Sequence, residues 1–163
     1  GSSTRESLAP MNEAAYSNYT ERAKRINALP SLSELLNFHE LKPTKALGQN
    51  FLLDLNLTNK IARLALSANG GATEGTTIEI GPGPGGLTRA LLLHDFVRVV
   101  AIEKDRRAVG LLQSLIDASA NCLAVIEADV HRPGAYAQLS QLLEDSTVMV
   151  YGEPEEKEAN GKN

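Results

Sequence analysis

Short apolar runs rich in β-branched residues alternate, in the second half of the chain, with longer segments whose apolar residues recur at helical spacing. The predicted strands cover residues 76–80, 97–102, 123–126 and 147–151, and the helices between them begin at Leu87, Arg106 and Pro133. The stripes expected to face the core are Leu111, Leu112, Leu115 and Ile116 in the second of these helices, and Tyr136, Leu139, Leu142 and Leu143 in the third. This alternation indicates an α/β fold, with a parallel sheet, helices on both faces and right-handed crossovers.

Three helices are predicted in the first half of the chain. Residues 12–27 are polar and helix-compatible with few apolar anchors, so we expect an exposed or partner-dependent helix there. Ser31 and Glu34 have the spacing of a capping box, which begins a short amphipathic helix. Asp54 can cap the third helix, whose apolar residues at helical spacing are Leu57, Ile61, Leu64, Ala65 and Ala68.

The composition describes a soluble globular protein, because 42% of the 163 residues are hydrophobic and 22% are charged. No apolar run approaches the roughly 18 residues of a membrane-spanning helix, so no membrane partner is expected. The net charge of −4 argues against binding nucleic acid by bulk charge, but Arg22, Lys24 and Arg25 form a local basic cluster. That cluster is either a solvated helix face or an RNA contact. The single cysteine, Cys122, and the widely spaced histidines predict no metal site.

A glycine-rich stretch, Gly81-Pro82-Gly83-Pro84-Gly85-Gly86, follows the first predicted strand and precedes a helix. A strand, a glycine-rich turn and a helix in this order form the nucleotide-side loop of an α/β sheet. The first, second and fourth glycines match the dinucleotide fingerprint G-x-G-x-x-G, and the first three match G-x-G-x-G. The two prolines have no N–H to donate to a pyrophosphate, which favours a nucleoside without phosphates, such as S-adenosylmethionine. A dinucleotide, or a tight turn without ligand, is the alternative.

Acidic residues stand at the ends of the next two predicted strands. Ligands bind outside the carboxyl ends of such strands, so Glu103 and Asp129 are expected to face the glycine loop. Glu103 follows Gly81 at about the spacing, roughly 20 residues, of the acid that accepts from ribose hydroxyls. Asp129 is suited to accept from the amine of an adenine, although ordinary strand-end solubility explains either acid alone. Glu79, just before the glycines, is a candidate for orienting the loop or ordering water.

Five segments of the chain together resemble one family. They are Leu29-Pro30-Ser31-Leu32, Lys45–Asp54 with its Gly-Gln-Asn-Phe-Leu stretch, Glu79–Thr88, Ile102–Asp105 and Ala128–Val130. They resemble the ribosomal RNA adenine dimethyltransferases, which include bacterial small-subunit enzymes and the mitochondrial relatives also called mitochondrial transcription factor B. The resemblance implies an incomplete Rossmann-like S-adenosylmethionine-dependent methyltransferase domain over residues 29–151. We expect an extension with an exposed helix at 1–28 and a loose acidic tail at 152–163.

The resemblance also implies which residues hold S-adenosylmethionine and what the protein acts on. The expected cofactor contacts are Gln49, Asn50 and Leu52 in a segment that closes over the cofactor, Gly81 and Gly83 in the loop, Glu103 at the ribose, Lys104 beside the adenine, and Asp129 with Val130 at the adenine. The family transfers two methyl groups to N6 of each of two neighbouring adenosines in small-subunit ribosomal RNA during ribosome assembly. The target base leaves its stack and its amine attacks the sulfonium methyl in line.

The chain departs from the family's pattern after the predicted strand at 147–151. The Asn-Leu-Pro-aromatic motif, which holds the target amine in the family, is absent from the 163 residues. We therefore expect a cofactor-binding half without catalytic residues, whose partners are the C-terminal half of the same protein and the small-subunit RNA. A non-catalytic ribosome-assembly or mitochondrial transcription factor is the first alternative, and an NAD-binding dehydrogenase half is the second. The segments around Pro30 and Asn50 most resemble mitochondrial and alphaproteobacterial members, which favours a mitochondrial location over a bacterial cytoplasm.

Overall fold

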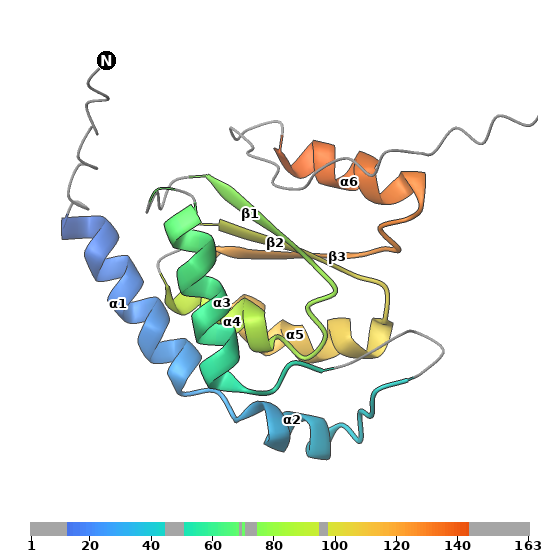
Figure 1. Ribbon diagram of the computed structural model, residues 1–163, viewed down its shortest axis with the longest axis horizontal. Coiled ribbons are helices and arrows are strands. Elements are labelled where there is room, and N and C mark those ends of the chain that lie inside the picture. Colours follow the sequence, from blue (N-terminus) through green and yellow to red (C-terminus); the bar gives the residue numbers. More distant parts are fainter. Residues whose placement is uncertain (1–12, 45–50, 69, 71–74, 95–97, 144–163) are drawn as a thin grey trace, which may run out of the picture.

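The computed structural model describes residues 13–44, 51–68, 70, 75–94 and 98–143 and shows an α/β fold (Figure 1). Its elements are α1 (Glu13–Asn27), α2 (Leu32–Phe38), α3 (Leu55–Ala68), β1 (Thr76–Ile80), α4 (Gly86–Leu93), β2 (Arg98–Glu103), α5 (Arg106–Ala118), β3 (Leu123–Glu127) and α6 (Pro133–Leu143). The predicted fold class is confirmed, with the first three predicted strands in place. The fourth predicted strand, the acidic tail and the pair Gln49-Asn50 lie outside the described residues.

The described strands form one parallel sheet in the order β1-β2-β3. Figure 1 shows α1, α3, α4 and α5 on one side of this sheet and α6 on the other. Paired residues such as Ile80 and Ile102 share a face, and their neighbours along each strand point to the opposite face. Because the strands are parallel, the carboxyl ends of all three meet at one edge of the sheet, where the sequence places its glycines and acids.

The central strand β2 is buried on both faces, which explains its nearly continuous apolar sequence. Val99 and Ala101 pack in the cluster formed with α4 and α5, whereas Val100 and Ile102 pack in the cluster that includes Leu139 of α6. The predicted stripe of α5 is confirmed, because Leu111, Leu112 and Leu115 are buried and Ile116 is partly buried. The stripe of α6 is wrong at Tyr136, which is 59% exposed, while Leu139 and Leu142 pack on the sheet.

Helix α1 is anchored to the sheet domain rather than being an exposed extension. Ile26 and Arg22 are only 2% and 6% exposed. Arg22 Nε donates to the Leu92 carbonyl at 3.2 Å, and the Tyr19 hydroxyl donates to the Leu93 carbonyl at 2.6 Å. These carbonyls end α4 and lack partners within their own helix, so α1 supplies the missing donors. The expected basic cluster is thereby divided, since Arg22 faces inward while Lys24 and Arg25 are exposed.

Helix α3 begins as predicted but turns a different face inward. Asp54 Oδ1 accepts from the backbone N–H groups of Asn56 and Leu57, at 2.9 and 3.3 Å, as a cap should. The fully buried residues are Thr58 and Ala62, whereas Leu64, in the predicted stripe, is 59% exposed. The buried face of α3 therefore consists of small side chains, with Leu66 partly buried against the same core, and differs from the face that apolar periodicity predicts. No helix in the described part of the chain is long and apolar enough to cross a membrane.

Candidate cofactor-binding site

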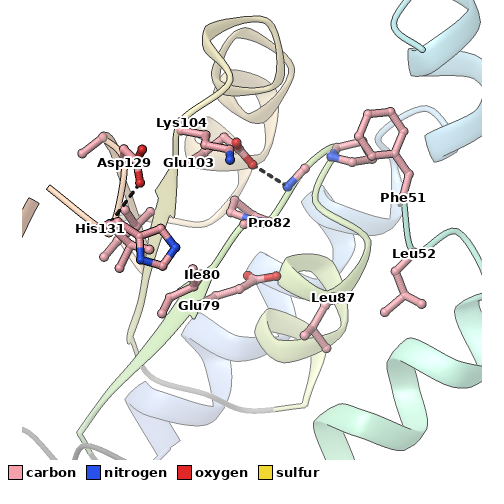
Figure 2. A pocket seen from close by; sticks show the side chains of 16 residues that line it. Phe51, Leu52, Glu79, Ile80, Pro82, Leu87, Glu103, Lys104, Asp129 and His131 are labelled. Atoms are coloured by element: carbon pink, nitrogen blue, oxygen red, sulfur yellow. Dashed lines mark hydrogen bonds between the residues drawn. The ribbon is translucent and has the colours of Figure 1, made fainter. Parts of the chain in front are cut away.

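A cavity of about 490 Å³ lies at the carboxyl ends of the three strands (Figure 2). Its lining includes each of the predicted cofactor residues that the structure describes: Leu52, Gly81, Gly83, Glu103, Lys104, Asp129 and Val130. The remaining predicted contacts, Gln49 and Asn50, lie outside the described residues. Residues far apart in the sequence are therefore brought together around one space of a size typical of small-molecule sites.

The glycine loop needs its glycines for backbone conformation. Gly81, Gly83 and Gly85 have φ angles of +70°, +54° and +92°, in the left-handed region that residues with a Cβ rarely adopt. A Cβ built on Gly81 would meet no atom within 4 Å, so this glycine borders open space. The loop thus leads from β1 into α4 while leaving room at its first glycine for a ligand.

The backbone N–H groups of this loop are already used within the protein. Gly81 N–H donates to the Ile102 carbonyl at 2.9 Å, and Gly85 N–H donates to the Pro82 carbonyl at 3.0 Å. Gly83 N–H donates to Glu103 Oε2 at 3.0 Å, and the prolines have no N–H at all. From Gly81 to Gly85 the loop therefore keeps no N–H for a phosphate oxygen.

The segment Phe51-Leu52 lies directly against the glycine loop. A Cβ built on Gly86 would fall 2.2 Å from the Leu52 carbonyl oxygen, and one on Gly83 would fall 3.3 Å from Phe51 Cδ1. Sequence reasoning treated Gly86 only as part of a nucleotide fingerprint and missed this contact. The sequence signal for this contact is the pair of glycines at 85–86. The second glycine of the pair is needed because Leu52 comes so close to it, and not because its φ angle is positive.

Glu103 holds the loop in place as well as facing the cavity. Its side chain is buried at 5% exposure, Oε2 accepts from Gly83 N–H, and Oε1 accepts from Asp105 N–H at 2.8 Å. A carboxylate oxygen has two lone pairs, so each oxygen can still accept from a ligand hydroxyl. The predicted ribose acid is thus preorganised by two backbone donors, a feature that the sequence spacing did not reveal.

The loop after β3 forms the opposite wall of the cavity. Asp129 Oδ1 accepts from His131 N–H at 3.0 Å, which fixes the turn, and the Asp129 side chain stays partly accessible. His131 lines the cavity beside Asp129 and was not among the predicted residues (Figure 2). Lys104, exposed at the end of β2, supplies positive charge at the cavity's rim.

Glu79 is a buried acid in the floor of the cavity. Its side chain is 7% exposed, and Oε2 accepts from the Thr88 hydroxyl at 2.7 Å. Burial raises the pKa of Glu79 to about 7, while the hydrogen bond from Thr88 opposes this rise and the Glu103 carboxylate adds to it. Glu79 therefore lies next to the loop, as predicted, and its raised pKa means that its carboxyl group titrates close to neutral pH.

Residues 40–153 match the family described as ribosomal RNA adenine dimethylase. The chain belongs to this family. It is 51% identical over 104 residues to ribosomal RNA small subunit methyltransferase A of Nitrobacter winogradskyi, covering 64% of this chain and 35% of the relative. The protein of that name from Cereibacter sphaeroides is 49% identical over 115 residues, covering 71% of this chain and 40% of the relative. The resemblance drawn from the motifs is confirmed.

The chain spans between 30% and 40% of the length of the curated relatives described here. A third such relative, from Rhodopseudomonas palustris, is 56% identical over 90 residues, which make up 55% of this chain and 30% of the relative. These relatives are bacterial proteins and give the expected mitochondrial location no support.

Proposed function

We propose that this chain is the S-adenosylmethionine-binding part of an enzyme that dimethylates adenines of small-subunit ribosomal RNA. The observation that carries the proposal is the glycine loop, whose N–H groups from Gly81 to Gly85 are absent or engaged within the protein. A dinucleotide needs such donors for its pyrophosphate, whereas S-adenosylmethionine has no phosphate. The family match supports the same cofactor and the same RNA substrate.

The residues around the cavity fit the adenosine part of S-adenosylmethionine. Glu103 offers free lone pairs to ribose hydroxyls, and Asp129 on the next strand end offers a carboxylate to the adenine amine. Gly81 borders open space where a Cβ would stand, which suits close approach of the ligand to the backbone. Glu103 and Asp129 therefore offer hydrogen-bond acceptors to the hydroxyl and amine donors of an adenosine.

The bound cofactor supplies an electrophilic methyl group on a sulfonium. The residues of this chain bind and orient it: Glu103 and Asp129 hold the adenosine, while the apolar side chains of Phe51, Leu52 and Leu87 line the opposite side of the cavity. The target adenine then needs acceptors for its amine, and the chain contains no Asn-Leu-Pro-aromatic sequence to provide them. We therefore assign target-base recognition to the rest of the complete protein.

Titration calorimetry with S-adenosylmethionine tests the proposal. Glu103→Ala is expected to weaken binding by about 1–3 kcal/mol, because it removes a charge-assisted acceptor and the clamp on Gly83. Glu127→Ala is the matched control, since Glu127 ends β3 as Glu103 ends β2 but is exposed and does not line the cavity. Equal affinities in both variants and the parent chain would exclude this site, and tighter binding of NADH would favour the dehydrogenase alternative.

The relatives' bacterial origin makes cytoplasmic action our proposal for location, in place of the mitochondrial one expected from the motifs. A non-catalytic assembly or transcription factor is the alternative for the complete protein. Fractionation of the source cells, with antibodies against the described domain, checks the location, and a signal enriched in mitochondria would overturn it.

A further inference from the structure

Arg107, in the first turn of α5, holds the buried carboxylate of Asp105 with two parallel hydrogen bonds. Its Nε donates to Asp105 Oδ1 at 3.0 Å, and its Nη2 donates to Oδ2 at 2.7 Å. The side chain of Asp105 is 5% exposed, whereas that of Arg107 is 53% exposed. An exposed ion pair contributes little by itself, but this pair has the two-pronged geometry that fixes a carboxylate in one orientation. Arg107 therefore fixes a buried acid from the surface of the protein.

Asp105 is in turn one of the two residues that fix Glu103. The Asp105 N–H donates to Glu103 Oε1 at 2.8 Å, and the Gly83 N–H donates to Oε2 at 3.0 Å (Figure 2). The Asp105 carboxylate also accepts from the Arg107 N–H at 3.0 Å and thereby caps α5. The position of the Asp105 N–H therefore depends on what holds the Asp105 side chain. The Arg107 guanidinium is thus connected to Glu103 through a single residue.

The guanidinium is also held from its outer side. Arg107 Nη2 donates to Thr44 Oγ1 at 2.9 Å, so the guanidinium is ordered although half of the side chain is exposed. Ala108, the next residue of α5, is buried in a cluster with Leu41, and Phe51 packs against this cluster. Phe51 also lies against the glycine loop. The start of α5 therefore reaches the cavity by two routes, a polar one through the two acids and an apolar one through the phenyl ring.

The polar route carries the charge of the site. Glu103 and Asp105 are both 5% exposed and lie two residues apart at the end of β2. Two buried carboxylates close to each other are unfavourable unless hydrogen bonds and a positive charge compensate them. Arg107 supplies such a charge through its ion pair with Asp105. Removal of the guanidinium is therefore expected to disturb both acids rather than Asp105 alone.

We propose that Arg107 is a positioning residue of the cofactor site, which fixes the Glu103 carboxylate for the ribose hydroxyls by holding Asp105. Arg107 lies outside the lining of the cavity, so it acts without touching the ligand. The inference rests on the proposed function, since it assumes that Glu103 accepts from the ribose of S-adenosylmethionine. Loss of Arg107 frees the Asp105 side chain, loosens one of the two donors to Glu103, and weakens the binding of ligands that carry ribose hydroxyls.

Calorimetry of the 163-residue chain with S-adenosylhomocysteine, which has the same ribose as S-adenosylmethionine, measures this effect. Arg107→Met is expected to weaken binding roughly threefold to tenfold, about the net contribution of one hydrogen bond. Arg106→Met is the matched control, since Arg106 is the exposed neighbour in the same turn and lies outside the lining of the cavity. Each variant loses one positive charge, so a difference between them excludes a general effect of charge. Equal affinities of the two variants would overturn the inference.

A double-mutant cycle with Glu103 shows whether the effect passes through that acid. In a chain that already carries Glu103→Ala, Arg107→Met is expected to cause no further loss, because the group that Arg107 positions is gone. The 2′,3′-dideoxy analogue of S-adenosylhomocysteine, which has no ribose hydroxyls, is expected to bind the parent chain and Arg107→Met equally. A merely structural role would weaken both ligands alike and would give the same loss in the Glu103→Ala background. That result would overturn the inference.

Two further variants separate the routes and guard against poor folding. Thr44→Val removes the outer partner of the guanidinium and leaves its pair with Asp105 intact, so it is expected to change the affinity little. A loss in Thr44→Val as large as that in Arg107→Met would assign the effect to the outer contact instead. Should Arg107→Met fold poorly in urea denaturation, Arg107→Lys keeps the charge without the paired donors, and the same cycle is measured with it.

The outcomes for the inference and for the proposed function can be told apart. If Glu103→Ala weakens binding and Arg107→Met does not, the inference is overturned while the proposed function stands. If S-adenosylhomocysteine and S-adenosylmethionine both fail to bind the parent chain, the proposed function and the inference are overturned together.

Discussion

At the scale of single residues, the cavity depends on one glycine whose role is purely steric. A Cβ on Gly86 would fall 2.2 Å from the Leu52 carbonyl oxygen, and backbone atoms cannot yield as a flexible side chain can. The space beside Gly86 is therefore what lets the segment Phe51-Leu52 lie against the glycine loop and close one side of the cavity.

Gly86→Ala is accordingly expected to destabilise the chain by about 1–3 kcal/mol, the usual cost of inserting a methyl group into a packed contact. It should also weaken S-adenosylmethionine binding, because Leu52 lines the cavity. Gly110→Ala is the control: Gly110 lies within α5 and a Cβ there meets no atom within 4 Å. Alanine favours helix, so this variant should gain roughly 0.5–1 kcal/mol. Urea denaturation measures both, and equal midpoints would contradict the proposed contact.

Site residues could be predicted from the sequence where their role depends on their position at the end of a strand. Roles that arise from tertiary contacts could not be predicted in this way. Glu103 and Asp129 were predicted because the carboxyl ends of parallel strands always meet at one edge. The bonds from Gly83 and Asp105 to Glu103 were not predicted, since they depend on how the loop folds back over β2. His131 lines the cavity only because the turn after β3 directs it there.

At the scale of elements, strand prediction succeeded because β2 is buried on both faces and needs apolar residues throughout. Helix faces were harder to predict. In α3 the fully buried residues are Thr58 and Ala62, whereas Leu55, Leu57 and Leu64 are exposed. In α1 Ile26 and Arg22 face inward, and the Arg22 guanidinium donates to the buried Leu92 carbonyl near the end of α4.

Arg22 is therefore expected to be the residue that docks α1. Arg22→Ala removes the hydrogen bond to the Leu92 carbonyl and the contact of its Nη1 with Cys122 Sγ at 3.1 Å. Leaving a buried acceptor unpaired costs about 1–3 kcal/mol, so the free energy of unfolding should fall by this amount. Arg25→Ala, an exposed position of the same helix, should change little. Equal losses in the two variants would show that α1 contributes only its helical propensity.

At the scale of the whole molecule, the α/β class and the site edge could be predicted from the alternation of strands and helices alone. The family could be predicted because its motifs sit at the three strand ends and in the segment before α3. The residues that bind the substrate could not be predicted, because the chain covers only 35% of a relative such as the Nitrobacter winogradskyi protein. The described sheet builds a cavity lined by the predicted cofactor residues, and the 163 residues contain no Asn-Leu-Pro-aromatic sequence.

Cofactor binding and methyl transfer should consequently separate between this chain and the complete protein. The chain contains the glycine loop and the acids that we propose hold the cofactor, so it should bind S-adenosylmethionine without methylating RNA. The complete protein should transfer labelled methyl groups to adenines of small-subunit RNA if, as we propose, its remaining part holds the target amine. Methyl incorporation measured with both proteins on the same RNA checks this. Transfer by the chain alone would show that its own residues hold the target base, and no transfer by the complete protein would favour the non-catalytic alternative.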